Sequence, residues 1–329
     1  MRSTPVTSTS CAMRRSGSPF TGVGVVLAKE TADYLSGTLI VLVQSIVFLL
    51  ALATIYFAIS EIRKTIGESP FLFLRLMTIA ASPAPFSFFE LLGILIPILA
   101  IVLGFDAING EFSRRTMSRV LAQPIYRDAL LLGKFLSGLL TLSIALVSLW
   151  LLVIGLGLLF LGLPPSTEET VRMLGFLLVA IAYGGVWFAI AMLFSVVFRA
   201  PATAVLSALG LWLVLTFFWT IFITPVLSTL IAGPPEDIFG PNIAYIQTAQ
   251  AVDRVSPNIL YGEAAVALLH PTLRTTGLLL YTPGMVLGAP LPVMQSFILV
   301  WPQLTGLVAE MILIFAVGYI AFQRQEIRA

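Results

Sequence analysis

Long runs of apolar residues recur six times along the chain, separated by polar stretches. A helix that crosses a hydrocarbon core about 30 Å thick needs roughly 20 mostly apolar residues, because every backbone N–H and C=O must be paired inside the segment. Six windows meet this requirement, at about 36–60, 88–105, 135–161, 171–198, 202–230 and 298–322. The pattern predicts an all-α integral membrane protein whose core is a six-transmembrane-helix bundle.

Composition supports this assignment. Of the 329 residues, 58% are hydrophobic and only 10% are charged, and the mean hydropathy is +1.01. A soluble domain carries about 25% charged residues, so a soluble globular fold is excluded. A multi-pass protein of the cell membrane is expected.

The basic residues predict the orientation, because segments rich in Lys and Arg stay in the cytoplasm. With the N-terminus inside, 12 of the 18 basic residues fall on the cytoplasmic side: Arg2, Arg14, Arg15, Lys29, Arg114, Arg115, Arg119, Arg127, Lys134, Arg199, Arg324 and Arg328. The other six are Arg63, Lys64, Arg75, Arg172, Arg254 and Arg274. Both termini are therefore predicted to be cytoplasmic.

The N-terminal region divides in two. Residues 1–19 are rich in Ser, Thr and Arg, which predicts a disordered cytoplasmic tail, and residues 20–329 form the transmembrane domain. Within 20–35, one helical face carries Val23, Val26, Leu27 and Tyr34, and another carries Lys29, Glu30 and Asp33. This pattern favours a helix lying in the inner interface; the alternative is a plain extension of the first span.

A long external segment is predicted between the fifth and sixth spans. Nine prolines within 232–302 exclude a further straight spanning helix. Residues 256–270 read as one short helix, with Ser256 as N-cap, Pro257 at the first position and His270 before the stopping Pro271. We expect the segment to cap the external mouth or to dip into the outer leaflet. The alternative is a seventh span within 276–300, which would place the C-terminus outside.

The candidate chemistry mostly excludes functions. No GxxxxGK[ST] phosphate-binding loop is present, so nucleotide hydrolysis by this chain alone is not expected. His270 is the only histidine and Cys11 the only cysteine, which leaves no Cys/His metal cluster and no Ser-His pair in a span. We expect no enzyme activity, no cofactor or metal in this chain, and no nucleic-acid partner.

Two polar residues fall inside predicted spans, Gln44 in the first and Glu310 in the last. An ionisable group at that depth costs a few kcal/mol unless it faces protein or water. Glu310 either lines a pathway or takes up a proton, or it hydrogen-bonds a neighbouring helix such as the one with Gln44. The structural role is favoured, because one carboxylate makes no proton relay.

The segment between the second and third spans predicts a charged helical hairpin. Residues 106–122 should continue the second helix out of the membrane, with Glu111 and Arg115 forming an i, i+4 pair. Pro124 should end that helix, and Asp128 can cap the next one. Such a hairpin contacts a soluble partner or holds the chain at the bilayer edge.

These residues resemble a known family. The spacing D-x4-E-x4-T-x4-L-x2-P-x2-R-x5-GK is formed by Asp106, Glu111, Thr116, Leu121, Pro124, Arg127, Gly133 and Lys134. It resembles the permease subunits of ABC type-2 transporters, particularly the NosY-like branch, as do the Lys29–Glu30 pair and the stretch SPNILYGEA after the fifth span. The family often has Gly where this chain has Arg115.

The resemblance implies a permease that pairs with a second copy of itself or a related permease, and with separate ATP-binding subunits that hold ATP and Mg²⁺. The hairpin would be the coupling element, with Glu111, Arg114 and Arg115 in the polar contact and Pro124 fixing the bend; export is the expected direction. The residues that this reading assigns to coupling are Asp106, Glu111, Arg114, Arg115, Thr116, Pro124, Arg127 and Lys134.

Two alternatives remain open. A membrane anchor or signalling subunit would bind an ATPase without moving a substrate. An ion channel or proton-coupled carrier would need more intramembrane polar groups than Gln44 and Glu310.

Overall fold

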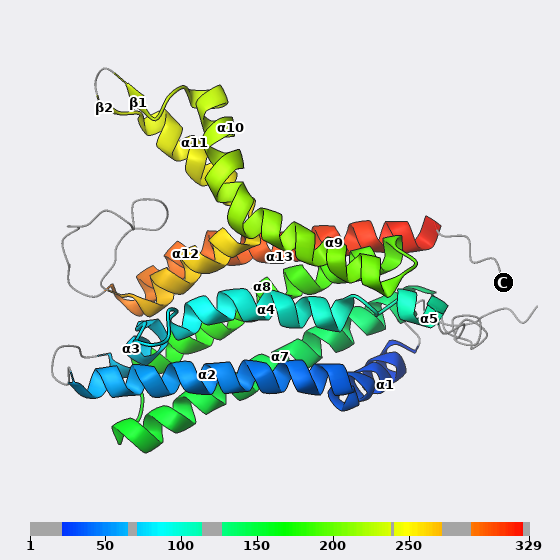
Figure 1. The fold of residues 1–329 in the computed structure, drawn as a ribbon, viewed down its shortest axis with the longest axis horizontal. Coiled ribbons are helices and arrows are strands. Elements are labelled where there is room, and N and C mark those ends of the chain that lie inside the picture. The colour runs from blue at the N-terminus through cyan, green and yellow to red at the C-terminus, as the bar shows by residue number, and fades with distance from the viewer. Residues whose placement is uncertain (1–21, 65–70, 114–126, 238–239, 272–290, 325–329) are drawn as a thin grey trace, which may run out of the picture.

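The computed structural model describes residues 22–64, 71–113, 127–237, 240–271 and 291–324. Figure 1 shows a bundle of long helices with a helical arm standing away from it. The elements are α1 (Val23–Ser36), α2 (Thr38–Lys64), α3 (Leu72–Thr78), α4 (Phe88–Gly104), α5 (Asn109–Ser113), α7 (Arg127–Leu161), α8 (Thr167–Val197), α9 (Pro201–Leu213), the π-helix η1 (Val214–Ile223), α10 (Thr224–Ala232), β1 (Glu236–Asp237), β2 (Gly240–Pro241), α11 (Ile243–Asp253), α12 (Pro257–Leu269) and α13 (Val293–Arg324).

The prediction of an all-α bundle with six spans is confirmed. Six helical stretches of the described chain are long and apolar enough to cross a membrane: α2, α4 with α5, α7, α8, the continuous α9–η1–α10, and α13. They coincide with the six predicted windows, although α7 and α13 begin earlier than expected. In the described residues, β structure is confined to the two-residue antiparallel pair of β1 and β2, where Glu236 lies opposite Pro241.

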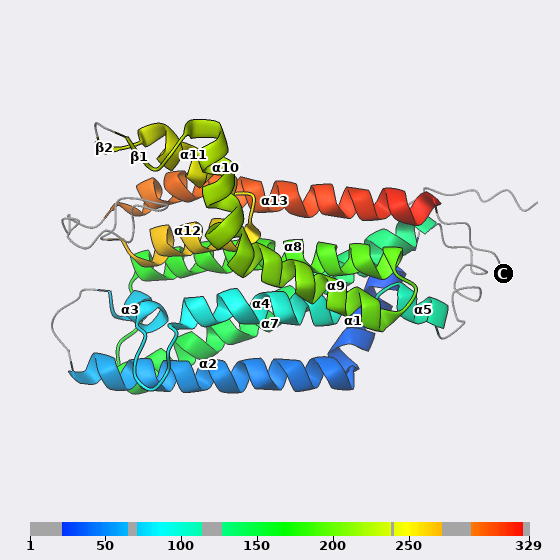
Figure 2. The ribbon, with the colours of Figure 1, turned by 45° about the horizontal axis from the view of Figure 1, so that its top comes forward.

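Helix α8 forms the centre of the bundle. Figure 2 shows it surrounded by the other long helices, and Tyr183, Trp187 and Phe188 near its middle are completely buried. A helix that is apolar on all sides is stable where every face packs against protein. In α2, by contrast, Leu42 and Leu49 remain exposed on the outer face, as lipid-facing residues would.

Small residues allow close packing at the centre. A Cβ atom added to Gly184 of α8 would lie 2.4 Å from Cδ2 of Leu142 on α7 and 2.9 Å from Cγ2 of Ile96 on α4. Without a hydrophobic drive between helices in lipid, such contact supplies much of the association energy. Gly184 thus lets three spans meet.

The two described ends of the chain lie at the same end of the bundle. In Figure 1, α1, α5 and the last turns of α13 lie together, whereas α3 lies at the opposite end. This arrangement agrees with termini on one side of the membrane. The assignment of that side to the cytoplasm remains a prediction from the basic residues.

Helix α1 is separate from the first span. The helix ends at Ser36, and Gly37 is extended, with φ −67° and ψ 121°; Figure 2 shows α1 and α2 at an angle. The simple extension of the first span is therefore wrong. The predicted division of faces also needs correction, because Glu30 is buried together with Val26. The predicted tail at 1–19 lies outside the described residues.

The segment after the fifth span contains the predicted short helix. Helix α12 spans Pro257–Leu269, with Pro257 in the first turn and His270 directly after the last, as expected. Ser256 does not cap with its side chain, because its Oγ donates to the carbonyl of Leu215 at 3.0 Å. Ala264 and Leu268 are fully buried, and α12 runs beside the spans (Figure 2), which fits the dipping arrangement. Most of the alternative seventh span, 276–300, falls outside the described residues.

A fully buried arginine holds this region to the bundle. Arg172 of α8 donates from Nη1 to Oγ of Ser296 at 2.8 Å and to the carbonyl of Leu268 at 3.4 Å. Its Nη2 bonds Glu168 at 2.8 Å and the carbonyl of Leu291 at 2.5 Å. One guanidinium therefore joins α8, the end of α12 and the start of α13. The sequence indicated only an external charge at Arg172.

Candidate coupling site

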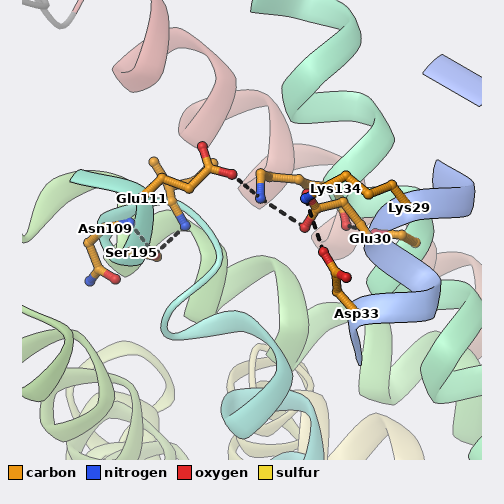
Figure 3. A network of polar contacts seen from close by, with 9 residues as sticks. Lys29, Glu30, Asp33, Asn109, Glu111, Lys134 and Ser195 are labelled. Carbon is orange, nitrogen blue, oxygen red and sulfur yellow. Dashed lines mark hydrogen bonds and ion pairs between the residues drawn. The ribbon is translucent and has the colours of Figure 1, made fainter. Parts of the chain in front are cut away.

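Three segments meet at one buried lysine. The Nζ atom of Lys134 on α7 lies 2.9 Å from Oε2 of Glu30 on α1 and 2.8 Å from Oε1 of Glu111 on α5. The Lys134 side chain is 4% exposed, and Figure 3 shows it between the two carboxylates. We call Glu30, Glu111 and Lys134, with the adjoining Lys29 and Asp33, the Lys134 cluster.

Gly133, the residue before the lysine, brings α1 onto α7. A Cβ atom at Gly133 would lie 2.7 Å from Cγ1 and 2.8 Å from Cβ of Val26. Such a distance is far inside van der Waals contact, so α1 can approach only where α7 lacks a side chain. The two residues of the Gly-Lys pair therefore have distinct roles. Gly133 leaves room for α1, and Lys134 forms an ion pair with Glu30 of α1.

The position of α5 depends on Ser195 of α8. Its Oγ accepts from the backbone N–H of Ile108 at 2.9 Å and of Asn109 at 3.1 Å. In a continuous helix those N–H groups would donate to the carbonyls of residues 104 and 105. Because Ser195 accepts them, α4 ends at Gly104, and α5 begins anew at Asn109.

This break corrects the prediction that 106–122 continues the second helix. Residues 105–108 form turns, and Asn109 is anchored further by its Nδ2 donating to the carbonyl of Phe198 at 3.3 Å. The turn redirects the chain so that Glu111 reaches Lys134. The predicted Glu111–Arg115 pair involves a residue outside the described part.

The exposed part of the Lys134 cluster consists of Lys29 and Asp33, which continue the series of ion pairs. Lys29 lies 2.9 Å from Glu30 and 3.0 Å from Asp33. Partial burial lowers the pKa of Lys29, but hydrogen bonds to these two carboxylates outweigh it, and the pKa lies above its ordinary value. Burial, with the nearby carboxylates, also raises the pKa of Tyr34. Both groups therefore keep their ordinary charge at neutral pH.

A cavity of about 650 Å³ lies beside the cluster. Its lining includes Asp33, Tyr34 and Asp106 together with the three ion-paired residues. The side chain of Asp106 lies against Gly110, where an added Cβ would come within 2.2 Å of Oδ1. Three predicted coupling residues, Asp106, Glu111 and Lys134, are thus brought to one place.

The other predicted coupling residues are not placed. Arg114, Arg115, Thr116 and Pro124 lie outside the described residues. Arg127 begins α7, and its side chain is not described. Asp128 sits in the first turn instead of capping it, and its Oδ1 accepts from the hydroxyl of Tyr319 on α13 at 3.0 Å.

The two intramembrane polar residues are unrelated to this site and to each other. Helices α2 and α13 lie on opposite sides of the bundle (Figure 2), so the suggested bond between Glu310 and the helix with Gln44 is wrong. Within the described chain, neither amide atom of Gln44 has a hydrogen-bond partner, nor has Oε2 of Glu310.

Sequence reasoning missed Glu30 as a buried ligand of Lys134, and it missed Ser195. Glu30 had a signal, since it lies four residues after Val26 and therefore shares its helical face. Ser195 lies in an apolar run, and no sequence signal marked it as a hydrogen-bond acceptor for α5. In the described residues no cluster of three or more His, Cys, Asp and Glu is arranged to hold a metal ion.

Six long apolar helices define a multi-pass membrane protein, and a buried cluster of charged residues joins α1, α5 and α7 at one end of the bundle. Residues 24–327 match the model of the ABC-2 family transporter proteins. The chain belongs to this family, and it is a membrane permease of the ABC type-2 class in the cell membrane.

One curated relative supports the assignment. The probable ABC transporter permease protein NosY of Pseudomonas aeruginosa is 35% identical to this chain over 144 residues, which make up 42% of this chain and 49% of the relative. The match thus spans about half the length of that relative.

Proposed function

We propose that this permease forms the substrate pathway of an ABC exporter and is driven by separate ATP-binding subunits. These subunits would dock at the end of the bundle that carries α1, α5 and the start of α7. Two permeases, either two copies of this chain or one copy and a relative, would complete the transporter. Export as the direction follows from the family resemblance.

The observation that carries the proposal is the double ion pair of Lys134. Glu111 belongs to the segment that leads into the hairpin between the second and third spans, and Glu30 belongs to the helix before the first span. A force on the hairpin would reach Lys134 directly through Glu111. Breaking a buried ion pair by removing one partner costs about 3–5 kcal/mol, so the three segments would move as one unit.

The same force would pass to the last span. Asp128 and Lys134 both lie near the start of α7, and Asp128 accepts a hydrogen bond from Tyr319 on α13. Helix α7 has 35 residues, so a tilt at its first turns would displace its far end. This geometry supports a permease in which the docked ATPases act on α1, α7 and α13 together.

The test is co-expression with a cassette ATPase encoded beside the permease gene, followed by ATP hydrolysis in lipid. Glu111→Gln removes the charge that pairs α5 with Lys134 and leaves Lys134 paired with Glu30, so the chain should fold and assemble. We expect membrane-dependent hydrolysis to fall sharply. Lys134→Met, which removes both ion pairs, should have the larger effect.

Lys64→Met is the matched control, because Lys64 also bonds a carboxylate, Glu61 at 2.9 Å, but is exposed at the opposite end of the bundle. It should leave hydrolysis unchanged. Full hydrolysis by a folded, assembled Glu111→Gln complex would refute the coupling role. Assembly without any substrate-dependent hydrolysis or transport would favour the membrane anchor instead.

A further inference from the structure

A second cavity is lined by residues of η1 and α11, the elements at the elbow where the α10–α11 arm leaves the bundle; Figure 1 shows this elbow. The volume of the cavity is about 490 Å³, and it is bounded by α4, α8, η1, α11 and α12. We call it the elbow cavity. Pockets of roughly 300–1,000 Å³ with an apolar lining and a few converging polar groups are typical of small-molecule sites.

One wall of the elbow cavity is acidic. Asp253 and Glu263 line it and are 4% and 6% exposed, and Glu90 lines it nearer to solvent. The negative charge of Glu263 is compensated by Arg254, whose Nε lies 3.0 Å from Oε2 of Glu263. Gln303 donates a hydrogen bond to the same oxygen at 2.9 Å.

Asp253 has no such compensation. Its Oδ1 accepts from the hydroxyl of Thr224 at 2.5 Å, and in the described part of the chain it forms no ion pair with Lys, Arg or His. Burial raises the pKa of this carboxyl group, as expected where a negative charge lacks a partner. His270, whose ring packs near Phe89, adds no charge at neutral pH, because burial lowers its pKa.

The lining also contains aromatic residues, among them Tyr183 and Tyr261. The rings of Tyr183 and Tyr261 stack with centroids 4.5 Å apart. Their hydroxyl groups are already used by α4, since Tyr261 donates to the carbonyl of Phe89 at 2.8 Å and Tyr183 lies 2.9 Å from that of Gly93. These two buried rings are thus held in place and make the lining rigid, while Phe86 and Phe89 supply more accessible aromatic rings, which attract cations.

The elbow itself is a π-helix, a rare form that often marks functional sites. Thr216 and Thr220, four residues apart on η1, both line the cavity. Trp219 holds α11 against η1 by donating from Nε1 to the carbonyl of Val252 at 2.9 Å. The uncompensated carboxylate of Asp253, one residue later, is therefore held at the cavity wall.

We propose that the elbow cavity binds an organic monocation with an apolar or aromatic body. The positive charge would pair with Asp253, and the body would lie against the apolar lining formed by Phe86, Phe89 and Ile94. The site goes beyond the proposed function, because it can be measured on the permease without an ATP-binding partner. Failure of binding would leave the coupling proposal standing, and failed coupling would leave binding measurable.

The test is equilibrium binding of tetraphenylphosphonium to the full-length permease in lipid nanodiscs, with neutral triphenylphosphine oxide as the shape control. We expect saturable binding of the cation and much weaker binding of the neutral compound. Asp253→Asn keeps an acceptor for Thr224 and removes the charge, so it should raise the Kd for the cation roughly tenfold, the effect of about 1.4 kcal/mol. Glu61→Gln, which neutralises an exposed carboxylate on α2, should leave the Kd unchanged.

A second variant tests the site independently, in case Asp253→Asn does not fold. Thr220→Lys supplies an ammonium group within the cavity and should abolish cation binding while leaving the arm packed. Absence of saturable binding, equal affinity for the neutral compound, or an unchanged Kd in both Asp253→Asn and Thr220→Lys would each overturn the proposal.

Discussion

The guanidinium of Arg172 on α8 lies 2.8 Å from the hydroxyl of Ser296 on α13. Through its other contacts the same side chain holds the end of α12 and the backbone before α13. The end of the bundle opposite α1 and α5 thus depends on one charge that is removed from solvent.

Replacing Arg172 by Met should destabilise the protein strongly. The substitution removes the donor to the carbonyls of Leu268 and Leu291 and to the hydroxyl oxygen of Ser296. Each buried polar group left without a hydrogen bond costs about 1–3 kcal/mol. Thermal unfolding in detergent, followed by tryptophan fluorescence, should show a large fall in Tm. Arg199→Met, at an exposed arginine beyond the other end of α8, should change Tm little; equal shifts in the two variants would contradict the structural role of Arg172.

Two glycines on α7 offer a matched pair for testing the contact with α1. Gly133→Ala places a methyl group 2.7 Å from Val26, whereas a methyl group at Gly155 meets nothing within 4 Å. Overpacking of this kind costs about 1–3 kcal/mol, while Gly→Ala at a helix position with free space is neutral or stabilising. We expect Gly133→Ala to release α1, measured as faster proteolysis near residue 36, and Gly155→Ala to behave as wild type. Unchanged protection in Gly133→Ala would show that α1 does not pack as described.

Ser195→Ala should loosen α5 without touching a charged residue. The backbone N–H groups of Ile108 and Asn109 lose their acceptor, at a cost of about 1–3 kcal/mol each if they stay buried. Hydrogen exchange with mass spectrometry should then report loss of protection in 105–113, and coupling through Glu111 should weaken. Ser143→Ala is the control, because that hydroxyl only donates to a carbonyl within its own helix. Full protection of 105–113 in Ser195→Ala would show that another group ends α4.

His270 gives a prediction for pH, and as the only histidine it makes the result easy to assign. Burial lowers its folded pKa below the ordinary 6.5. A group whose pKa is lower in the folded state than in the unfolded state stabilises the fold above its unfolded pKa. For His270 this stability is present above pH 6.5 and is lost as the pH falls through the pKa of the folded state. The Tm of wild type should therefore drop between pH 7 and 5, and His270→Gln should flatten that drop. A parallel fall in both proteins would assign the pH dependence to carboxylates instead.

The spans were predictable because their signal is the composition of single windows. Lipid requires about 20 apolar residues in a row wherever a helix crosses, so windows such as 171–198 could be read without knowing their neighbours. The same holds for α12, whose ends are marked locally by Pro257 and Pro271. Helix ends that depend on a distant partner were not predictable, as at Gly104, where Ser195 decides the break.

The site was predictable only in part, for the same reason. The family resemblance pointed to Asp106, Glu111 and Lys134, and these residues do converge. It did not indicate that Glu30 turns inward, because a carboxylate on an amphipathic helix normally belongs to the solvated face. The approach of α7 at Gly133 and the ion pair with Lys134 together make that burial favourable. The acidic wall around Asp253 likewise depends on how the α10–α11 arm folds back, which no local pattern encodes.

The ion pairs of Lys134 also set an order for biosynthesis. Glu30 and Glu111 precede Lys134 in the chain, so both carboxylates are synthesised before the ammonium that joins them. The link that Lys134 makes between α1 and α5 therefore cannot form until the start of the third hydrophobic segment has been synthesised. The lysine then joins two segments that lie on either side of the first two spans in the chain.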